Sequence, residues 1–164
     1  MDVVGGGGCW GCSVVVGEMK ILSVAETKDW LQNNDIKFGR GFRLERDHLE
    51  SKFGIPSDAG QRVALVSKKM ETFRSASRVF VVVEQWSVWP SAERMHIFER
   101  FRLSYGDSRK LMDAPAQLFT GAEFDDAVSL VTLAVLFLWD CHIVTRKGAR
   151  QLFFCHDEFG LSNS

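Results

Sequence analysis

Residues 120–139 carry the sequence TGAEFDDAVSLVTLAVLFLW, which contains the longest uncharged apolar run of the chain. Between residues 127 and 139 only one serine and one threonine are polar. A helix that is apolar on almost every side must be enclosed, either by its own domain or by a second subunit. A run of this length is too short to cross a bilayer, which takes about 20 helical residues. We therefore predict a buried helix over residues 123–139.

The start of this helix is marked by two local signals. Thr120 and Glu123 have the spacing of a capping box, in which each side chain accepts a hydrogen bond from a free backbone amide of the first turn. Phe119 and Phe124 flank the cap as a hydrophobic staple. Two aspartates follow at residues 125–126, where the positive end of the helix dipole favours acidic side chains.

The strongest strand signal is RVFVVVEQW, at residues 78–86. A nearly continuous run of β-branched and aromatic side chains is typical of a central strand that is covered on both faces. Two more strands, at residues 140–145 and 151–156, are predicted to form an antiparallel hairpin around a glycine-containing turn. A three-residue turn would place Cys141 opposite Cys155, and a four-residue turn would shift the pairing by one residue.

Capping residues and apolar spacing predict further, shorter helices. Ser23 and Glu26 form another capping box, and Ser57 or Asp58 can cap the helix after it. The predicted helices cover residues 24–33, 47–53, 58–73 and 91–105, and the predicted irregular segments are 37–43, 107–118 and 160–164. Together these elements indicate an α+β fold, a small antiparallel sheet packed by about four to five helices.

Composition places the chain among globular proteins. It has 164 residues, 46 % of them hydrophobic, and a formal net charge of −1. These values exclude intrinsic disorder, and the lack of a basic excess argues against a general nucleic-acid binder. Glycine-rich residues 1–18 are predicted to be a tail or edge strand, which leaves one domain over 19–164. Four cysteines and no signal-peptide pattern favour a cytoplasmic protein with reduced thiols.

The predicted hairpin holds the candidate catalytic residues His142, His156, Asp140, Asp157 and Glu158. A carboxylate beside an imidazole can support acid–base chemistry or help to hold a divalent cation. The alternative is a polar strand end whose side chains make turn and cap hydrogen bonds. Adjacent strand residues point to opposite faces, so the two Cys-His dipeptides cannot supply a Cys2His2 shell by themselves. The sequence therefore predicts no metal site and no cofactor.

Three other patterns in the sequence are typical of binding or redox chemistry, but each lacks part of its usual context. The C-x-x-C pair of Cys9 and Cys12 precedes a strand-like run, not the helix that would activate the first thiol. A G-x-G-x-x-G match at residues 6–11 lacks the flanking strand and helix of a dinucleotide site. Basic and aromatic residues interleave over 37–46 and could contact phosphates, but a short solvated loop is the simpler interpretation.

Three tryptophans adjoin the predicted ends of elements. They are Trp86, Trp89 and Trp139, and aromatic side chains in such places can line a ligand pocket. The alternative is that they close the edge of the core.

Several C-terminal segments resemble a pattern in uncharacterised bacterial proteins. They are Trp86–Glu93, Ser104–Asp107, Trp139–Asp140 and His156–Glu158, spread over residues 79–160. The resemblance implies a bacterial accessory protein, and it assigns no activity and no catalytic residue.

We therefore expect a non-enzymatic binding or accessory protein, from a mobile or orphan bacterial gene, that takes a small ligand or a protein partner. A homodimer is expected, because the apolar helix and the many aromatic residues exceed what a small monomer hides. The alternative is a small hydrolase that uses His142 or His156 with the nearby carboxylates. An enzyme requires an imidazole within hydrogen-bond reach of a carboxylate in a concave site, whereas a binding module disperses these groups.

Overall fold

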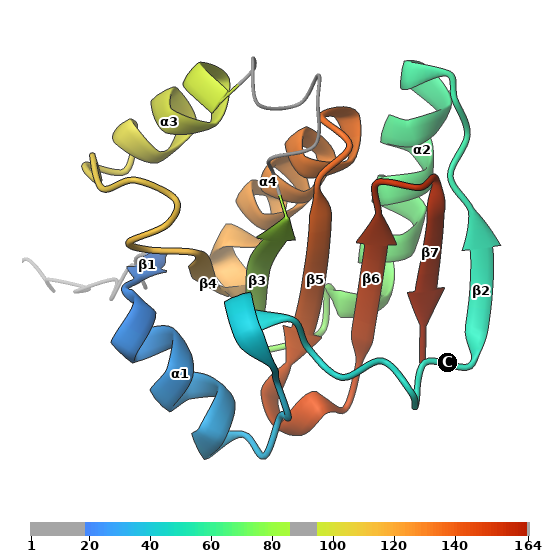
Figure 1. Ribbon diagram of the computed structural model, residues 1–164. Helices are drawn as coiled ribbons and strands as arrows, with labels where there is room; N and C mark the ends of the chain where they lie inside the picture. Colours follow the sequence, from blue (N-terminus) through green and yellow to red (C-terminus); the bar gives the residue numbers. More distant parts are fainter. Residues whose placement is uncertain (1–18, 86–94, 164) are drawn as a thin grey trace, which may run out of the picture.

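The structure of the protein, a computed structural model, describes residues 19–85 and 95–163. In this part of the chain a seven-stranded sheet has the order β1-β4-β3-β5-β6-β7-β2, with all neighbours antiparallel. Four α-helices accompany it (Figure 1). The predicted α+β fold is confirmed, although the sheet is larger than the small one expected. The predicted tail at residues 1–18 lies outside the described residues.

Figure 1 labels the helices and strands and colours them in the order of the sequence. The strands are β1 (Lys20–Leu22), β2 (Ser51–Gly54), β3 (Arg78–Gln85), β4 (Ala116–Thr120), β5 (Asp140–Thr145), β6 (Gln151–Cys155) and β7 (Phe159–Ser162). The helices are α1 (Val24–Asn33), α2 (Ala59–Met70), α3 (Met95–Leu103) and α4 (Phe124–Leu136). A 3₁₀ turn, η1 (Arg40–Phe42), lies between α1 and β2.

Both faces of the sheet are covered. Val79 and Val81 of β3 belong to the core shared with α2 and α4, while Phe80 and Val82 pack on the other face with α1 and the segment 36–44. Figure 1 shows α2 and α4 behind the sheet, with α1 and η1 in front of it. β3 is therefore a central strand buried on both sides, as its continuous apolar run predicts.

The apolar helix is confirmed, with a shift at its end. The predicted capping box of Thr120 and Glu123 is formed, and a 3₁₀ turn leads into α4 at Phe124. The helix ends at Leu136, three residues before the predicted end, because Leu138 adopts a left-handed conformation (φ 57°) that turns the chain into β5. Among the described residues, no helix has the length and apolar character needed to span a bilayer.

Three short segments contradict their predicted structure. Residues 47–53 are not a helix, and Ser51–Gly54 instead form the edge strand β2. The predicted connection over 107–118 contains the start of β4, and the predicted frayed end contains most of β7. Each segment gains its hydrogen bonds from a neighbouring strand distant in sequence, for example β2 from β7, so local propensity gives no sign of it.

The hairpin takes the four-residue alternative for its turn. Cys141 pairs with Phe154, and Val144 with Gln151. Continuing this register by one pair places Asp140, not Cys141, opposite Cys155. This shift brings a carboxylate and a thiol to the same face at the end of the hairpin.

Candidate functional site

The candidate catalytic residues fall into separate contacts. His142 lies in one buried cluster, while His156 contacts both Asp140 and Asp157 in a second. Glu158 forms an ion pair with an arginine in the first turn of α2. The hairpin therefore brings three of the five candidate residues together, and it places His142 and Glu158 in separate contacts.

His142 is enclosed between two side chains. Its Nδ1 lies 3.2 Å from Glu84 Oε1 and its Nε2 lies 3.1 Å from Gln151 Oε1. The side chains of His142 and Glu84 are both 0 % exposed. The backbone amide of Leu44 donates to Glu84 at 3.0 Å, and Arg46 pairs with the same carboxylate. His142 is thus committed to packing, and no substrate reaches it without opening the sheet.

Glu84 fastens the basic segment to the sheet. Glu84 forms an ion pair with Arg46. The guanidinium group of Arg46 in turn lies over the ring of Phe153, 3.5 Å from the ring centroid. This role of Glu84 is not among the predictions from the sequence, although one signal is present there: a lone carboxylate inside an otherwise apolar, doubly covered strand. A charge in such a place needs partners, because burying it unpaired is costly.

Asp140 and His156 form a partly exposed pair at the end of the hairpin. β5 begins at Asp140 and β6 ends at Cys155, so antiparallel pairing brings these two ends to one edge. Asp140 Oδ1 accepts hydrogen bonds from the His156 backbone amide at 2.8 Å and from its Nδ1 at 2.7 Å. The His156 Nε2 lies 3.4 Å from the exposed Asp157 carboxylate. The contact at Nδ1 holds the imidazole ring in a fixed orientation beside the carboxylate.

The two described cysteines are not activated nucleophiles. Burial raises the pKa of the Cys141 thiol far above its ordinary value, and burial also raises the pKa of Cys155. Cys155 Sγ nevertheless lies 4.0 Å from His156 Nδ1. Because the thiolate is the reactive form, neither thiol is prepared for attack at neutral pH.

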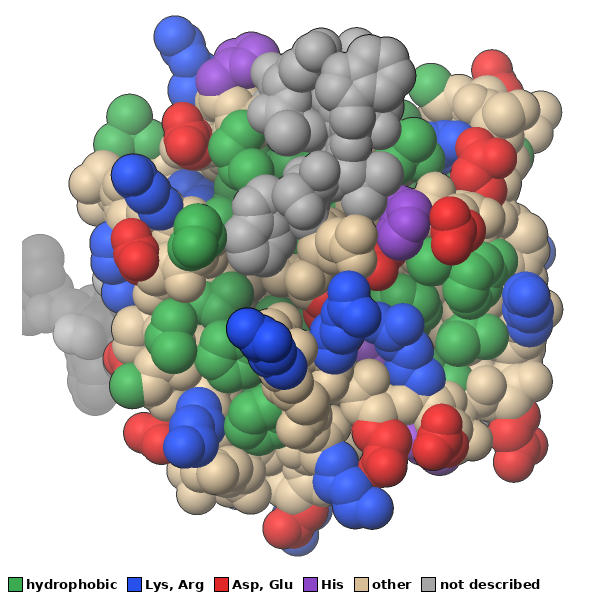
Figure 2. Space-filling model, in the orientation of Figure 1, with side chains coloured by type: hydrophobic (Ala, Val, Ile, Leu, Met, Phe, Trp, Pro, Cys, Tyr) green, Lys and Arg blue, Asp and Glu red, His purple; other side chains and the backbone are tan. Residues whose placement is uncertain are grey.

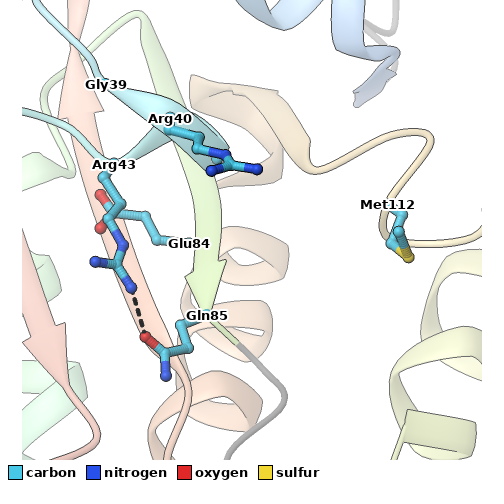
Figure 3. Close-up of a pocket in the computed structure, with 7 residues that line it drawn as sticks. Gly39, Arg40, Arg43, Glu84, Gln85 and Met112 are labelled. Carbon is cyan, nitrogen blue, oxygen red and sulfur yellow. Dashed lines mark hydrogen bonds between the residues drawn. The ribbon is translucent and has the colours of Figure 1, made fainter.

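A hollow of about 690 Å³ opens beside the end of β3. Its lining comes from η1 and its neighbours, from β3 and from the loop after α3: Gly39, Arg40, Gly41, Arg43, Glu84, Gln85 and Met112. Figure 3 shows Arg40 reaching toward the side where Met112 stands, and Arg43 descending to Gln85. Figure 2 shows Lys and Arg side chains gathered near the middle of this face. Its size falls within the usual range of small-molecule sites, about 300–1,000 Å³.

The polar lining of this hollow consists mainly of donors. Arg43 Nη2 donates to Gln85 Oε1 at 2.9 Å. The Gln85 amide nitrogen has no hydrogen-bond acceptor among the residues that the structure describes. Arg40 has no ion-pair or hydrogen-bond partner among the residues that the structure describes. The one carboxylate in the lining, Glu84, is already engaged by Arg46 and Leu44. The hollow therefore favours an anion.

A second hollow offers less free charge. It measures about 540 Å³ and its basic side chains are Lys69 and Arg150. Arg150 donates to the Thr72 carbonyl and to Ser75, while the Lys69 ammonium lies 3.9 Å from the ring centroid of Phe53. Both cations are engaged, so the hollow at η1 is the better candidate for an anion.

The predicted tryptophan pocket is not assembled by the described residues. Trp139 is 1 % exposed and packs in the apolar core against Phe98 and Phe137. Trp86 and Trp89 lie outside the described residues.

Comparison of the chain with protein-family models, curated proteins and solved structures finds no significant match. The resemblance to uncharacterised bacterial proteins therefore stays a prediction, and function is inferred from the geometry alone.

Proposed function

We propose that the protein is a non-enzymatic binding protein whose ligand is a small anion held in the hollow at η1. The observation that carries this proposal is the presence of two exposed arginines, Arg40 and Arg43, in the wall of a hollow with no free carboxylate among its described lining residues. Guanidinium groups bind carboxylates and phosphates through paired, charge-assisted hydrogen bonds. Met112 adds an apolar wall for the body of an organic anion.

The separation of the candidate catalytic residues supports binding over catalysis. His142 is fully buried, and His156 is held by Asp140 at a different place from His142. The alternative, a small hydrolase, rests on the 2.7 Å contact of Asp140 with His156. It lacks an activated thiol among the described residues, because burial raises the pKa of both cysteines there.

The test is calorimetric titration with sulfate, phosphate and succinate at constant ionic strength. We expect saturable binding of at least one of these anions, weakened about tenfold or more by Arg40→Ala and by Arg43→Ala, the cost of one charge-assisted contact. Arg78→Ala is the matched control: this exposed arginine begins β3, and the hollow lies at the other end, about 20 Å away at 3.3 Å per residue.

Two outcomes would overturn the proposal. One is equal weakening by Arg78→Ala, which would mean unspecific attraction. The other is turnover of chromogenic carboxylate or phosphate esters that is lost in His156→Ala, which would establish the hydrolase instead.

The cellular setting belongs to the same proposal. We place the protein in a bacterial cytoplasm as an accessory protein, supported by the two free, buried cysteines Cys141 and Cys155. Detection of a disulfide to either residue in protein taken from cells would argue against this placement.

A further inference from the structure

We propose that Asp140, Cys155 and His156 form a binding site for a zinc-class divalent metal ion. This inference is independent of the proposed anion site and assigns a separate ligand to the end of the hairpin. The three residues each offer one donor atom, an oxygen, a sulfur and a nitrogen, and these atoms all lie within 4.8 Å of one another.

The spacing of the donors is close to that of a metal shell. His156 Nδ1 lies 2.7 Å from Asp140 Oδ1 and 4.0 Å from Cys155 Sγ. In a tetrahedral zinc site, with metal–ligand bonds of about 2.0–2.3 Å, neighbouring donors are about 3.3–3.6 Å apart. Side-chain rotations that move the donors by about half an ångström give this spacing. On coordination the Cys155 thiol releases its proton to solvent, and the imidazole carries its proton on Nε2, which faces Asp157.

The backbone holds two of the donors in place without the metal. Asp140 Oδ1 accepts from the His156 backbone amide at 2.8 Å, which ties the first residue of β5 to the turn after β6. The same oxygen also lies 2.7 Å from His156 Nδ1. Hydrogen bonds of this kind orient side chains that can act as metal ligands.

The surroundings favour a cation. The side chains of Asp140 and His156 are 6 % and 24 % exposed, so the set is sheltered yet reachable from the His156 side. Asp157, 71 % exposed, adds a carboxylate 3.4 Å from His156 Nε2. A thiol ligand selects zinc-class ions over calcium and magnesium, which prefer oxygen. Three protein donors leave a fourth position for water.

The test uses Co²⁺ as a spectroscopic substitute for Zn²⁺. Reduced, metal-free protein carrying Cys9→Ser and Cys12→Ser, which removes the C-x-x-C pair, is titrated with Co²⁺ and then with Zn²⁺. We expect one metal per chain, a sulfur-to-cobalt charge-transfer band in the near ultraviolet, and displacement of that band by Zn²⁺. Cys155→Ser should abolish the band, and Asp140→Asn and His156→Ala should each weaken binding about tenfold or more.

Cys141→Ala is the matched control, because it removes the other described thiol from the opposite face of the sheet. It should leave the cobalt spectrum unchanged. Circular dichroism of every variant, and a rise in melting temperature with Zn²⁺ in the parent but not in Cys155→Ser, separate metal loss from misfolding. Absence of stoichiometric metal at micromolar Co²⁺ or Zn²⁺, or equal effects of Cys141→Ala and Cys155→Ser, would overturn the site. Neither result bears on the anion titration.

Discussion

Gly160 lies in β7, between its partner strands β2 and β6. A Cβ atom on this residue would stand 2.1 Å from Phe53 Cζ in β2 and 2.8 Å from the Phe153 carbonyl oxygen in β6. The ring can rotate away, but the backbone oxygen cannot without disturbing the β6–β7 pairing. We expect Gly160→Ala to lower the free energy of unfolding by about 1–3 kcal/mol, the usual cost of overpacking.

Urea denaturation measures this difference, and Gly54→Ala is its control. Gly54 lies in the adjacent strand β2 with nothing within 4 Å of an added Cβ. Its substitution should be neutral or slightly stabilising. Equal stability of Gly160→Ala and the parent protein would show that the close approach at β7 is not rigid.

The residues of the two candidate sites show what the sequence could and could not predict. Asp140 and His156 are candidates from sequence because carboxylate and imidazole stand beside a predicted strand end. The participation of Cys155 depends on the register, since a three-residue turn would have placed it opposite Cys141 instead of Asp140. Arg40 and Arg43 were visible only as part of a basic loop, because their pocket is completed by Met112, which is distant in sequence.

Among the elements, α1 begins with a cap whose strength depends on pH. The Lys20 ammonium and the Ser23 cap hold the pKa of Glu26 at about 2, below its ordinary 4.5. A lowered folded-state pKa stabilises the fold above the unfolded pKa, and this contribution is lost as pH falls through the folded value. We expect Glu26→Gln to cost about 0.5–1 kcal/mol at neutral pH, a modest figure because the side chain is 39 % exposed.

The measurement is the difference in unfolding free energy between Glu26→Gln and the parent protein, followed from neutral pH down to about pH 2. The difference should shrink as the pH falls below 4.5 toward 2. Asp29→Asn removes a charge from the middle of α1, where its carboxylate has no hydrogen-bond partner among the described residues, and should show a smaller effect. A difference that stays constant with pH would exclude the charged cap as its cause.

Elements were predictable where they carry their own signals. α1, α2 and α4 have caps and apolar stripes, and β3 has a continuous apolar run, so each could be found locally. β2 and β7 have only four residues each. β2 pairs with β7, and β7 also pairs with β6. Strands this short are specified by their neighbours, so the width of the sheet could not be counted from sequence.

For the whole molecule, the expected homodimer stays a prediction, but the surface expected to form the dimer contact is no longer α4. That prediction rested on the apolar helix and on the many aromatic residues, but six residues of α4 are buried within their own chain. A dimer would have to use other apolar side chains, such as Leu103 on α3, which is 58 % exposed. Light scattering after size exclusion should give about twice 18.5 kDa, and Leu103→Asp should return the mass of one chain.

Val63→Asp on α2 is the control for that experiment, because Val63 is also exposed (41 %) but lies on another element. It should leave the dimer intact. A mass of 18.5 kDa for the parent protein at the highest concentration would end the self-association hypothesis.

The two proposed sites are neighbours, which leads to a prediction of coupling between them. Gln85, in the wall of the anion hollow, is paired directly with Asp140 across β3 and β5. Paired residues have Cα atoms about 4.5–5.5 Å apart and point to the same face. With Zn²⁺ held by the Asp140 carboxylate, the Cys155 thiolate and a neutral His156, the net charge of this set rises from −1 to zero beside the hollow. At such short range we expect bound Zn²⁺ to tighten sulfate binding about three- to tenfold. Sulfate should tighten Zn²⁺ binding by the same factor, because coupling between sites is reciprocal.

Calorimetry with sulfate, an anion that neither chelates nor precipitates zinc, measures the coupling in both directions. Cys155→Ser in the Cys9→Ser, Cys12→Ser background should keep sulfate binding and lose the zinc effect. Equal sulfate affinity with and without bound zinc would show that the two sites, even if both exist, act independently.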